Sequence, residues 1–183
     1  MIGYWPDTWI EWTASLLGAW LLADFLSGLF HWLEDRYGNP AWPIIGQLIV
    51  LPNQTHHSRP GLLCQGSYWN RNNTTIATSL LGAGLFFWCG PLCLAFLFLS
   101  QGNEVHAWAH QRCNRVIRLL QQLGVLQSPE QHRVHHQRPF DCYFCVMTGY
   151  LNPALHWLGF WPRLELLIWR LTGITPRPER ENG

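Results

Sequence analysis

Eight of the nine histidines in this 183-residue chain occur in a pattern that suits metal binding. They are His31, His56, His57, His106, His110, His132, His135 and His136. Residues three or four apart share one face of a helix. His106 with His110, and His132 with His135 or His136, can therefore each present two imidazoles to one ion. Imidazole is a ligand for iron, zinc and copper. Eight nitrogen donors are too many for one ion and suit two, so the sequence predicts a two-metal site. The isolated His156 is left out of it.

Three polar residues are candidates for supporting that site. Asp24 stands seven residues before His31 on the same helical face, where it could accept a hydrogen bond from a ligand imidazole. The alternative is that Asp24 bonds a hydroxyl or the backbone inside a helix bundle. Asn103 shares a face with His106 and could hold a water on a metal, whereas Asp141 could support a ligand or simply form a turn.

The cysteines and the charge exclude some classes of protein. A chain this long and apolar is not a small secreted disulfide scaffold, so the six cysteines are expected as free thiols. Cys142-x-x-Cys145 could be a redox or zinc pair, but structural zinc wants a second pair of similar spacing, which favours small buried thiols. A net charge of +1 gives no reason to expect a nucleic acid partner. The 12 tryptophans suit membrane interfaces.

Two apolar runs are long enough to position the site in a membrane. The first, roughly residues 12–33, has the length that a helix needs to cross a bilayer. The second, residues 74–100, carries no charge and contains Gly90-Pro91, which interrupts a helix. Two interpretations compete for this second run: one kinked helix, or two short helices in a tight hairpin.

The basic residues favour the hairpin. All 12 are arginines; none precedes Arg36 and none lies between Arg71 and Arg112. By the positive-inside rule, the segments that follow each apolar run are cytoplasmic, and the arginine-free N-terminus is outside. A chain that enters and leaves the second run on one side crosses twice, so we expect about three transmembrane helices. This topology places all eight histidines on the cytoplasmic side. No basic segment precedes the first run, so we expect no cleaved signal peptide.

The remaining segments complete an all-α prediction. Residues 116–126 and 163–172 have helical apolar spacing, and residues 155–161 are rich in aromatic side chains, so all three are expected as interfacial helices or segments. We predict a single integral-membrane helical domain over residues 1–178, with a polar tail at 179–183.

Several motifs together resemble the Kua-type lipid desaturase family. They are ADFLSGLFHW (23–32), THH (55–57), NEVHAWAH (103–110), QHRVHH (131–136) and TGYLNPALHWLGFWPRLELLIWRLTG (148–173), and the resemblance covers residues 20–178. That family includes plasmanylethanolamine desaturases and a plastid phosphatidylglycerol desaturase. The resemblance implies that the eight histidines bind two iron ions, with O2 as co-substrate. One departure is Asn53, which stands where the usual HxxHH pattern has its first histidine.

The resemblance implies a membrane enzyme that puts a double bond into an alkyl or acyl chain of a glycerophospholipid. The GFWPRLE segment favours the plasmanyl branch, which forms vinyl ethers. The alternatives are phosphatidylglycerol acyl-chain desaturation, hydroxylation by the same site, and non-enzymatic metal binding. No catalytic residue beyond the metal ligands is predicted.

No flavin or nicotinamide fingerprint is present, because Gly82-x-Gly84 lies in an apolar run without strand–turn–helix context. We therefore expect an external electron donor of the ferredoxin or cytochrome b5 type. Five arginines could form its docking patch or contact lipid headgroups: Arg112, Arg115, Arg118, Arg133 and Arg138.

Overall fold

A computed structural model describes residues 3–177, and the predicted tail at 179–183 lies outside this range. The described residues form helices and contain no β-strand, which confirms the all-α prediction. The α-helices are α1 (Trp9–Arg36), α2 (Leu51–Ser58), α3 (Tyr68–Leu85), α4 (Gly90–Leu99), α5 (Gly102–His110), α6 (Arg115–Gln122), α7 (Pro129–His135), α8 (Leu151–Trp157) and α9 (Phe160–Thr172). A π-helical turn (Gly46–Val50) precedes α2, and a 3-10 turn (Pro60–Leu62) follows it.

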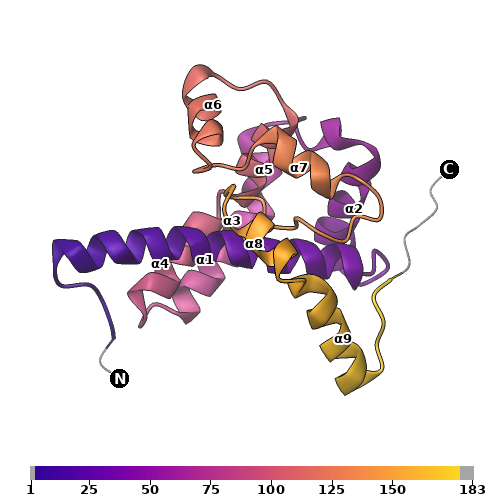
Figure 1. The fold of residues 1–183 in the computed structure, drawn as a ribbon, viewed down its shortest axis with the longest axis horizontal. Helices are drawn as coiled ribbons and strands as arrows, with labels where there is room; N and C mark the ends of the chain where they lie inside the picture. Colours follow the sequence, from indigo (N-terminus) through magenta and orange to yellow (C-terminus); the bar gives the residue numbers. More distant parts are fainter. Residues whose placement is uncertain (1–2, 178–183) are drawn as a thin grey trace.

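Helix α1 is the axis of the molecule (Figure 1). It begins at a capping box, in which Thr8 accepts from the Glu11 amide and the Glu11 carboxylate accepts from the Thr8 amide. Its 28 residues give a length of about 42 Å. Among the described helices α1 alone is long and apolar enough to cross a membrane, and a third of its most apolar window is buried in the protein.

The second apolar run forms two helices, as the hairpin interpretation predicts. Helix α3 ends at Leu85, and α4 begins at Gly90 with Pro91 in its first turn, where proline is tolerated. Helix α4 packs between α1 and α3. The N-terminal segment adjoins the turn, because the Tyr4 amide donates to the Trp88 carbonyl and the Gly90 amide donates to the Tyr4 carbonyl. With 10 residues, α4 is short for a membrane span, so the three-span topology stays a prediction.

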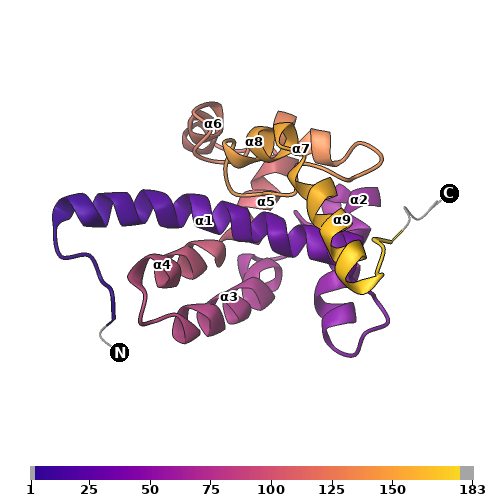
Figure 2. The same cartoon turned by 60° about the horizontal axis from the view of Figure 1, so that its bottom comes forward.

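The remaining helices lie on the other side of α1 and at its C-terminal end (Figure 2). The predicted segment 116–126 becomes α6 and the turn after it, and 163–172 lies within α9. The aromatic segment 155–161 spans the junction of α8 and α9, where Gly159 adopts a left-handed conformation.

The core that anchors these helices is built on α1. Trp32 stacks on Trp161 of α9, with ring centroids 5.7 Å apart. Arg36 donates to the Glu165 carboxylate at 2.7 and 3.2 Å, and Trp32 donates to the same group. A second buried cluster joins α1 to the α4–α5 region and the segment before α8: Ala23, Leu99, Val105, Leu126 and Met147. The C-terminal half of α1 is therefore packed among the elements that carry the histidines.

Candidate metal centre

The fold brings the eight predicted histidines together in two adjoining groups. The first group contains His56, His106, His110, His132 and His136. The second group contains His31, Asp35, His57 and His135. In each group the possible ligand atoms lie within 4.8 Å of one another. His156 lies outside both groups, beside Tyr143, as the sequence predicts.

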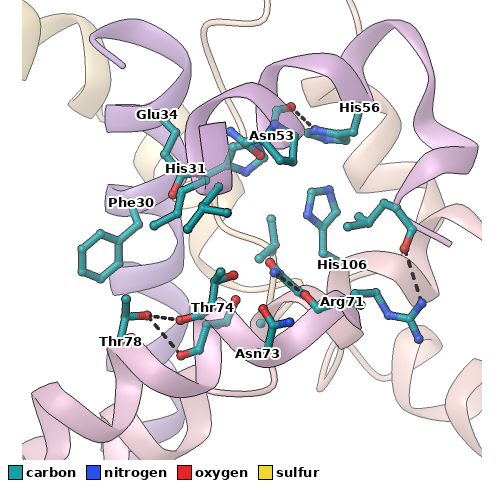
Figure 3. A pocket seen from close by; sticks show the side chains of 18 of the residues that line it. Phe30, His31, Glu34, Asn53, His56, Arg71, Asn73, Thr74, Thr78 and His106 are labelled. Carbon is teal, nitrogen blue, oxygen red and sulfur yellow. Dashed lines mark hydrogen bonds between the residues drawn. The ribbon is translucent and has the colours of Figure 1, made fainter. Parts of the chain in front are cut away.

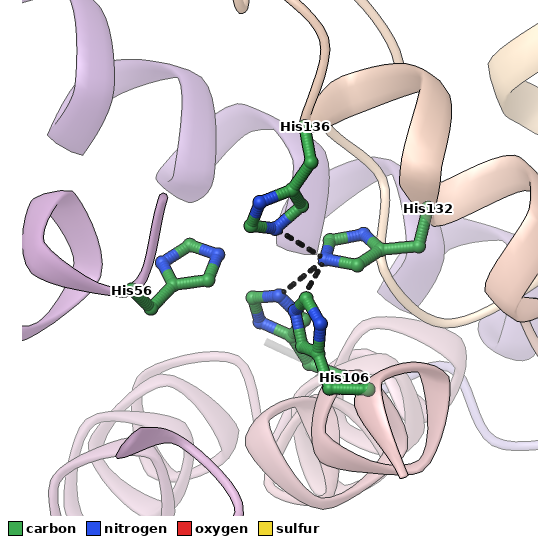
Figure 4. Close-up of side chains that lie close together, drawn as sticks. His56, His106, His132 and His136 are labelled. Carbon is green, nitrogen blue, oxygen red and sulfur yellow. Dashed lines mark hydrogen bonds between the residues drawn. The ribbon is translucent and has the colours of Figure 1, made fainter. Parts of the chain in front are cut away.

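His132 is the hub of the first group (Figure 4). Its Nε2 lies 2.8 Å from the Nε2 of His106, 2.8 Å from that of His110 and 3.0 Å from that of His136. One ring nitrogen has a single proton or a single lone pair, so it cannot hydrogen-bond to three others at once. Two imidazole ligands about 2.1 Å from one ion, at right angles, would be about 3.0 Å apart. The spacing therefore fits nitrogens that surround a cation.

The second group centres on the Asp35 carboxylate. Asp35 Oδ2 lies 3.1 Å from His57 Nε2, 3.3 Å from His31 Nε2 and 3.4 Å from His135 Nε2. Three nitrogens around one oxygen again describe a cation site, here with a mixed nitrogen and oxygen donor set. The groups share a boundary, since the His56 and His57 ring centroids are 4.5 Å apart.

Backbone carbonyls hold the second ring nitrogen of several histidines. His31 Nδ1 lies 3.1 Å from the Phe144 carbonyl oxygen, and His135 Nδ1 lies 2.9 Å from that of Cys142. His56 Nδ1 faces the Asn53 carbonyl in the same way. A carbonyl only accepts, so each Nδ1 carries the proton and each Nε2 presents its lone pair. The Nε2 atoms of His31, His56 and His135 are buried without a hydrogen-bond partner in the described structure, as metal-binding atoms would be.

The electrostatics keep the first group neutral. Burial lowers the pKa of His56, His106 and His132 well below the usual value, and neighbouring imidazoles lower it further. Burial likewise lowers the pKa of His110 to about 4 and that of His136 to about 2. Neutral imidazoles at pH 7 have lone pairs available for a metal.

Asp35 is the site residue that sequence reasoning missed. The available signal was its position four residues after His31, on the same face of α1. Its second oxygen, Oδ1, accepts a hydrogen bond of 2.9 Å from the Asn53 side chain. Asn53, the departure from the HxxHH pattern, therefore contacts both groups, through its side chain to Asp35 and through its carbonyl to His56.

The three predicted supporting residues occupy different places. Asp24 is buried away from the imidazoles: its carboxylate accepts from the Met147 amide and from the amide and hydroxyl of Thr148, at 2.6–2.9 Å. The prediction that Asp24 bonds a ligand imidazole is therefore wrong, and its alternative describes the observed contacts. Asn103 donates to the Arg71 carbonyl at 2.9 Å and lines the same cavity as His106. Asp141 lines a separate small pocket with His156.

The cysteines take no part in either group. All six are free thiols, and Cys142 and Cys145 come from the segment that carries the carbonyl acceptors. Within residues 3–177, the donors are thus imidazoles and one carboxylate. This set suits iron or another borderline ion better than a thiolate-preferring one.

A cavity of about 720 Å³ opens onto both groups (Figure 3). His31 of the second group and His56 and His106 of the first group line it. Its other walls come from α1, the π-helical turn and α2, and α3 to α5. Apolar side chains such as Phe30, Leu48 and Leu99 share the lining with polar ones such as Asn73 and Thr74. The volume and mixed lining suit part of an amphipathic molecule.

The comparisons with known protein sequences find desaturases that act in lipid metabolism. A family model described as a lipid desaturase domain matches residues 20–179. Plasmanylethanolamine desaturase 1 of Mus musculus is 33% identical, over 98% of this chain and 72% of the relative. The plasmanylethanolamine desaturase of Myxococcus xanthus is 30% identical, over 94% and 65%. Fatty acid desaturase 4-like 1, chloroplastic, of Arabidopsis thaliana is 28% identical, over 98% and 64%. No solved structure matches the chain.

Proposed function

The chain belongs to the lipid desaturase family, and from this premise we propose that it is an O2-dependent di-iron enzyme that introduces a double bond into a hydrocarbon chain of a glycerophospholipid. The observation that carries the proposal is the pair of adjoining histidine groups at the wall of one cavity. When bound, two iron ions would supply the oxidising power that removes two hydrogens from neighbouring carbons.

The protein's own residues would hold the ions and orient the lipid. We assign the eight predicted histidines and Asp35 as ligands, five to the first ion and four to the second. The carbonyls of Asn53, Cys142 and Phe144 fix the tautomer of three of these imidazoles. The cavity would place the lipid chain beside His31, His56 and His106, whose side chains are buried.

Two observations support a plasmanyl lipid as the substrate. The two plasmanylethanolamine desaturases match nearly the whole chain, at 33% and 30% identity over 98% and 94% of it. The cavity also carries polar side chains close to the ligands, since Asn103 stands one helical turn before His106. A vinyl ether forms at the carbons next to the glycerol, so a polar lining near the ions suits that reaction better than one far along an acyl chain.

We further propose that the enzyme is a multi-pass membrane protein with its metal centre at the cytoplasmic side. The support is the absence of arginine from residues 1–35 and 72–111. Large apolar side chains are exposed along the N-terminal half of α1 and at the hairpin, including Trp9, Leu17, Leu81 and Leu85. A lipid environment would cover this surface.

The test is lipid analysis combined with metal analysis of the purified protein. Cells that express the chain are supplied with a 1-O-alkyl ethanolamine phospholipid, and we expect acid-labile vinyl ethers and about two irons per chain. His106→Ala should abolish the product. His156→Ala is the matched control and should retain it, because His156 lies outside both groups.

Other products would select the alternatives. A new double bond in the acyl chains of phosphatidylglycerol would identify an acyl-lipid desaturase, and a hydroxylated chain would identify a hydroxylase. Zinc or copper in place of iron, with no lipid product, would leave a metal-binding protein. Formation of the vinyl ether by His106→Ala would contradict the assignment of the site.

A further inference from the structure

We propose that electrons enter the metal centre through the imidazoles that do not line the lipid cavity, from a small acidic one-electron carrier that docks on three exposed arginines. This inference rests on the proposed function, which requires an external reductant. The docking surface, here called the basic rim, consists of Arg112, Arg133 and Arg138.

The metal centre has two distinct edges. The cavity is lined by His31, His56 and His106, whose side chains are 3–5% exposed. The partly exposed imidazoles are His57, His110 and His136, and none of these is among the described residues that line the cavity. The His57 and His136 rings stack with centroids 5.0 Å apart, and His110 lies 4.7 Å from His136. These three rings form a solvent edge that includes members of both groups.

The arginines of the basic rim stand next to histidines of this solvent edge in the sequence. Arg112 comes two residues after His110, and Arg133 and Arg138 stand on either side of His136. All three arginines are exposed. Near these three arginines the chain has two carboxylates, Glu130 and Asp141. The excess of positive charge beside the solvent edge would steer an acidic partner.

The reaction needs such a partner because its electrons do not otherwise balance. Converting –CH2–CH2– to –CH=CH– releases two electrons and two protons, whereas reducing O2 to two waters takes four of each. The remaining two electrons must come from a reductant, and the sequence carries no flavin or nicotinamide fingerprint. Two one-electron deliveries from an iron–sulfur or haem protein would close the balance, with two protons from solvent.

The surface around the rim favours a soluble protein over a lipid bilayer. In the fully described stretch 124–149 no large apolar side chain is exposed. The α6 helix differs, because Val116, Leu119 and Leu123 are 54–65% exposed along one stripe of it. Arg115 and Arg118 share that helix and are therefore placed with the lipid-facing surface, outside the rim.

The test measures binding directly, without lipid turnover. Purified protein in detergent, with and without iron, is titrated with an acidic [2Fe–2S] ferredoxin and, separately, with the soluble haem domain of a cytochrome b5. We expect the double variant Arg112→Glu/Arg133→Glu to raise the Kd for the carrier that binds by about tenfold or more, and to weaken its salt dependence. A second readout is the rate at which the iron-loaded protein reoxidises the reduced carrier, which should fall in parallel.

The control is Arg163→Glu/Arg170→Glu, which makes the same charge change at exposed arginines of α9 and should leave the Kd unchanged. The proposal is overturned if the rim variant binds the carrier as wild type does, if the control weakens binding equally, or if neither carrier binds wild type. It is also overturned if the rim variant loses only its binding to vesicles of phosphatidylglycerol and phosphatidylcholine. Failure of the proposed function would show instead as carrier binding without any lipid product.

Discussion

A single carboxylate distinguishes the second group of ligands from the first. Asp35 Oδ2 faces three imidazole nitrogens at 3.1–3.4 Å, and among the described residues it is the one anionic donor in either group. Replacement by asparagine keeps the shape but removes the charge that offsets a cation. We therefore expect Asp35→Asn to lower the iron content from about two ions to about one per chain, measured by mass spectrometry of the purified protein.

Asp141→Asn is the matched control for this loss. Asp141 lies in the separate small pocket beside His156, so its variant should keep both ions. Retention of two ions by Asp35→Asn would show that the carboxylate is not a ligand. Equal loss in both variants would point to a general effect of acidic residues on folding.

Protonation of the imidazoles gives a pH dependence whose sign is set by burial. The pKa of His110 falls from 6.5 to about 4 in the folded chain, mainly because of burial. Between these values the unfolded chain binds more protons than the folded one, so the stability of the metal-free protein is full above pH 6.5 and falls toward pH 4. We expect the Tm of the metal-free protein to drop across this interval. His110→Asn should reduce this fall in Tm. An unchanged dependence of Tm on pH in the variant would contradict the attribution of the fall to His110.

The comparison of Asp24 with Asp35 shows what sequence spacing could predict at this scale. Most of the eight histidines were predictable because their spacing already groups them, whereas His31 stands alone in the sequence and was included through the topology and the family resemblance. Asp24 and Asp35 lie on the same helix as His31, so spacing alone made both possible partners. Which of the two carboxylates is available to the imidazoles depends on a distant contact. Thr148, 124 residues from Asp24, donates a hydrogen bond to the Asp24 carboxylate and occupies it. Periodicity along one helix carries no information about such a contact.

At the scale of elements, α1 must approach the 144–148 segment closely for the second group to form. A Cβ on Gly28 would lie 2.5 Å from Cys145 Sγ and 3.0 Å from the Cys145 amide nitrogen. The neighbouring Phe144 carbonyl is the acceptor for His31. We expect Gly28→Ala to displace this segment, lower the Tm by several degrees (about 1–3 kcal/mol of overpacking) and weaken binding of the second iron.

Gly18→Ala is the control for this prediction within the same helix. No atom lies within 4 Å of a Cβ at Gly18, and alanine favours a helix by about 1 kcal/mol over glycine. Its Tm should therefore stay the same or rise. Equal Tm values for the two variants, measured by thermal unfolding in detergent, would show that close approach at Gly28 is not needed.

The hairpin was predictable at this scale because Gly90-Pro91 and the arginine pattern both pointed to it. The lengths of its arms were not. Helix α3 begins at Tyr68, before the uncharged run, because Ser67 caps it, and α4 ends at Leu99, just before α5. Local capping and the approach of α3 and α5, where Arg71 meets Glu104 at 2.8 Å, set these ends. Hydropathy alone does not report such contacts.

At the scale of the whole molecule, the segment around Tyr4 and the hairpin turn occupy the same end. The Tyr4 amide and carbonyl pair with Trp88 and Gly90, whereas the histidines lie around the C-terminal half of α1 (Figure 2). If α1 crosses the bilayer, both Tyr4 and the hairpin turn lie on the side of the membrane opposite the metal centre. A chain with the hairpin turn and the N-terminus on opposite sides would have to break these main-chain bonds.

Labelling with an impermeant maleimide tests this arrangement in intact cells. Asp7→Cys introduces a thiol at an exposed position beside the N-terminal segment, and Gln137→Cys introduces one at an exposed position beside His136. We expect Asp7→Cys to label above the background of the native cysteines without permeabilisation, and Gln137→Cys to label only after it. Labelling of Gln137→Cys in intact cells would place the metal centre and the basic rim outside, where no cytoplasmic electron carrier could reach them. The proposed electron path and the proposed membrane topology therefore both require that Asp7→Cys and Gln137→Cys differ in their labelling in intact cells.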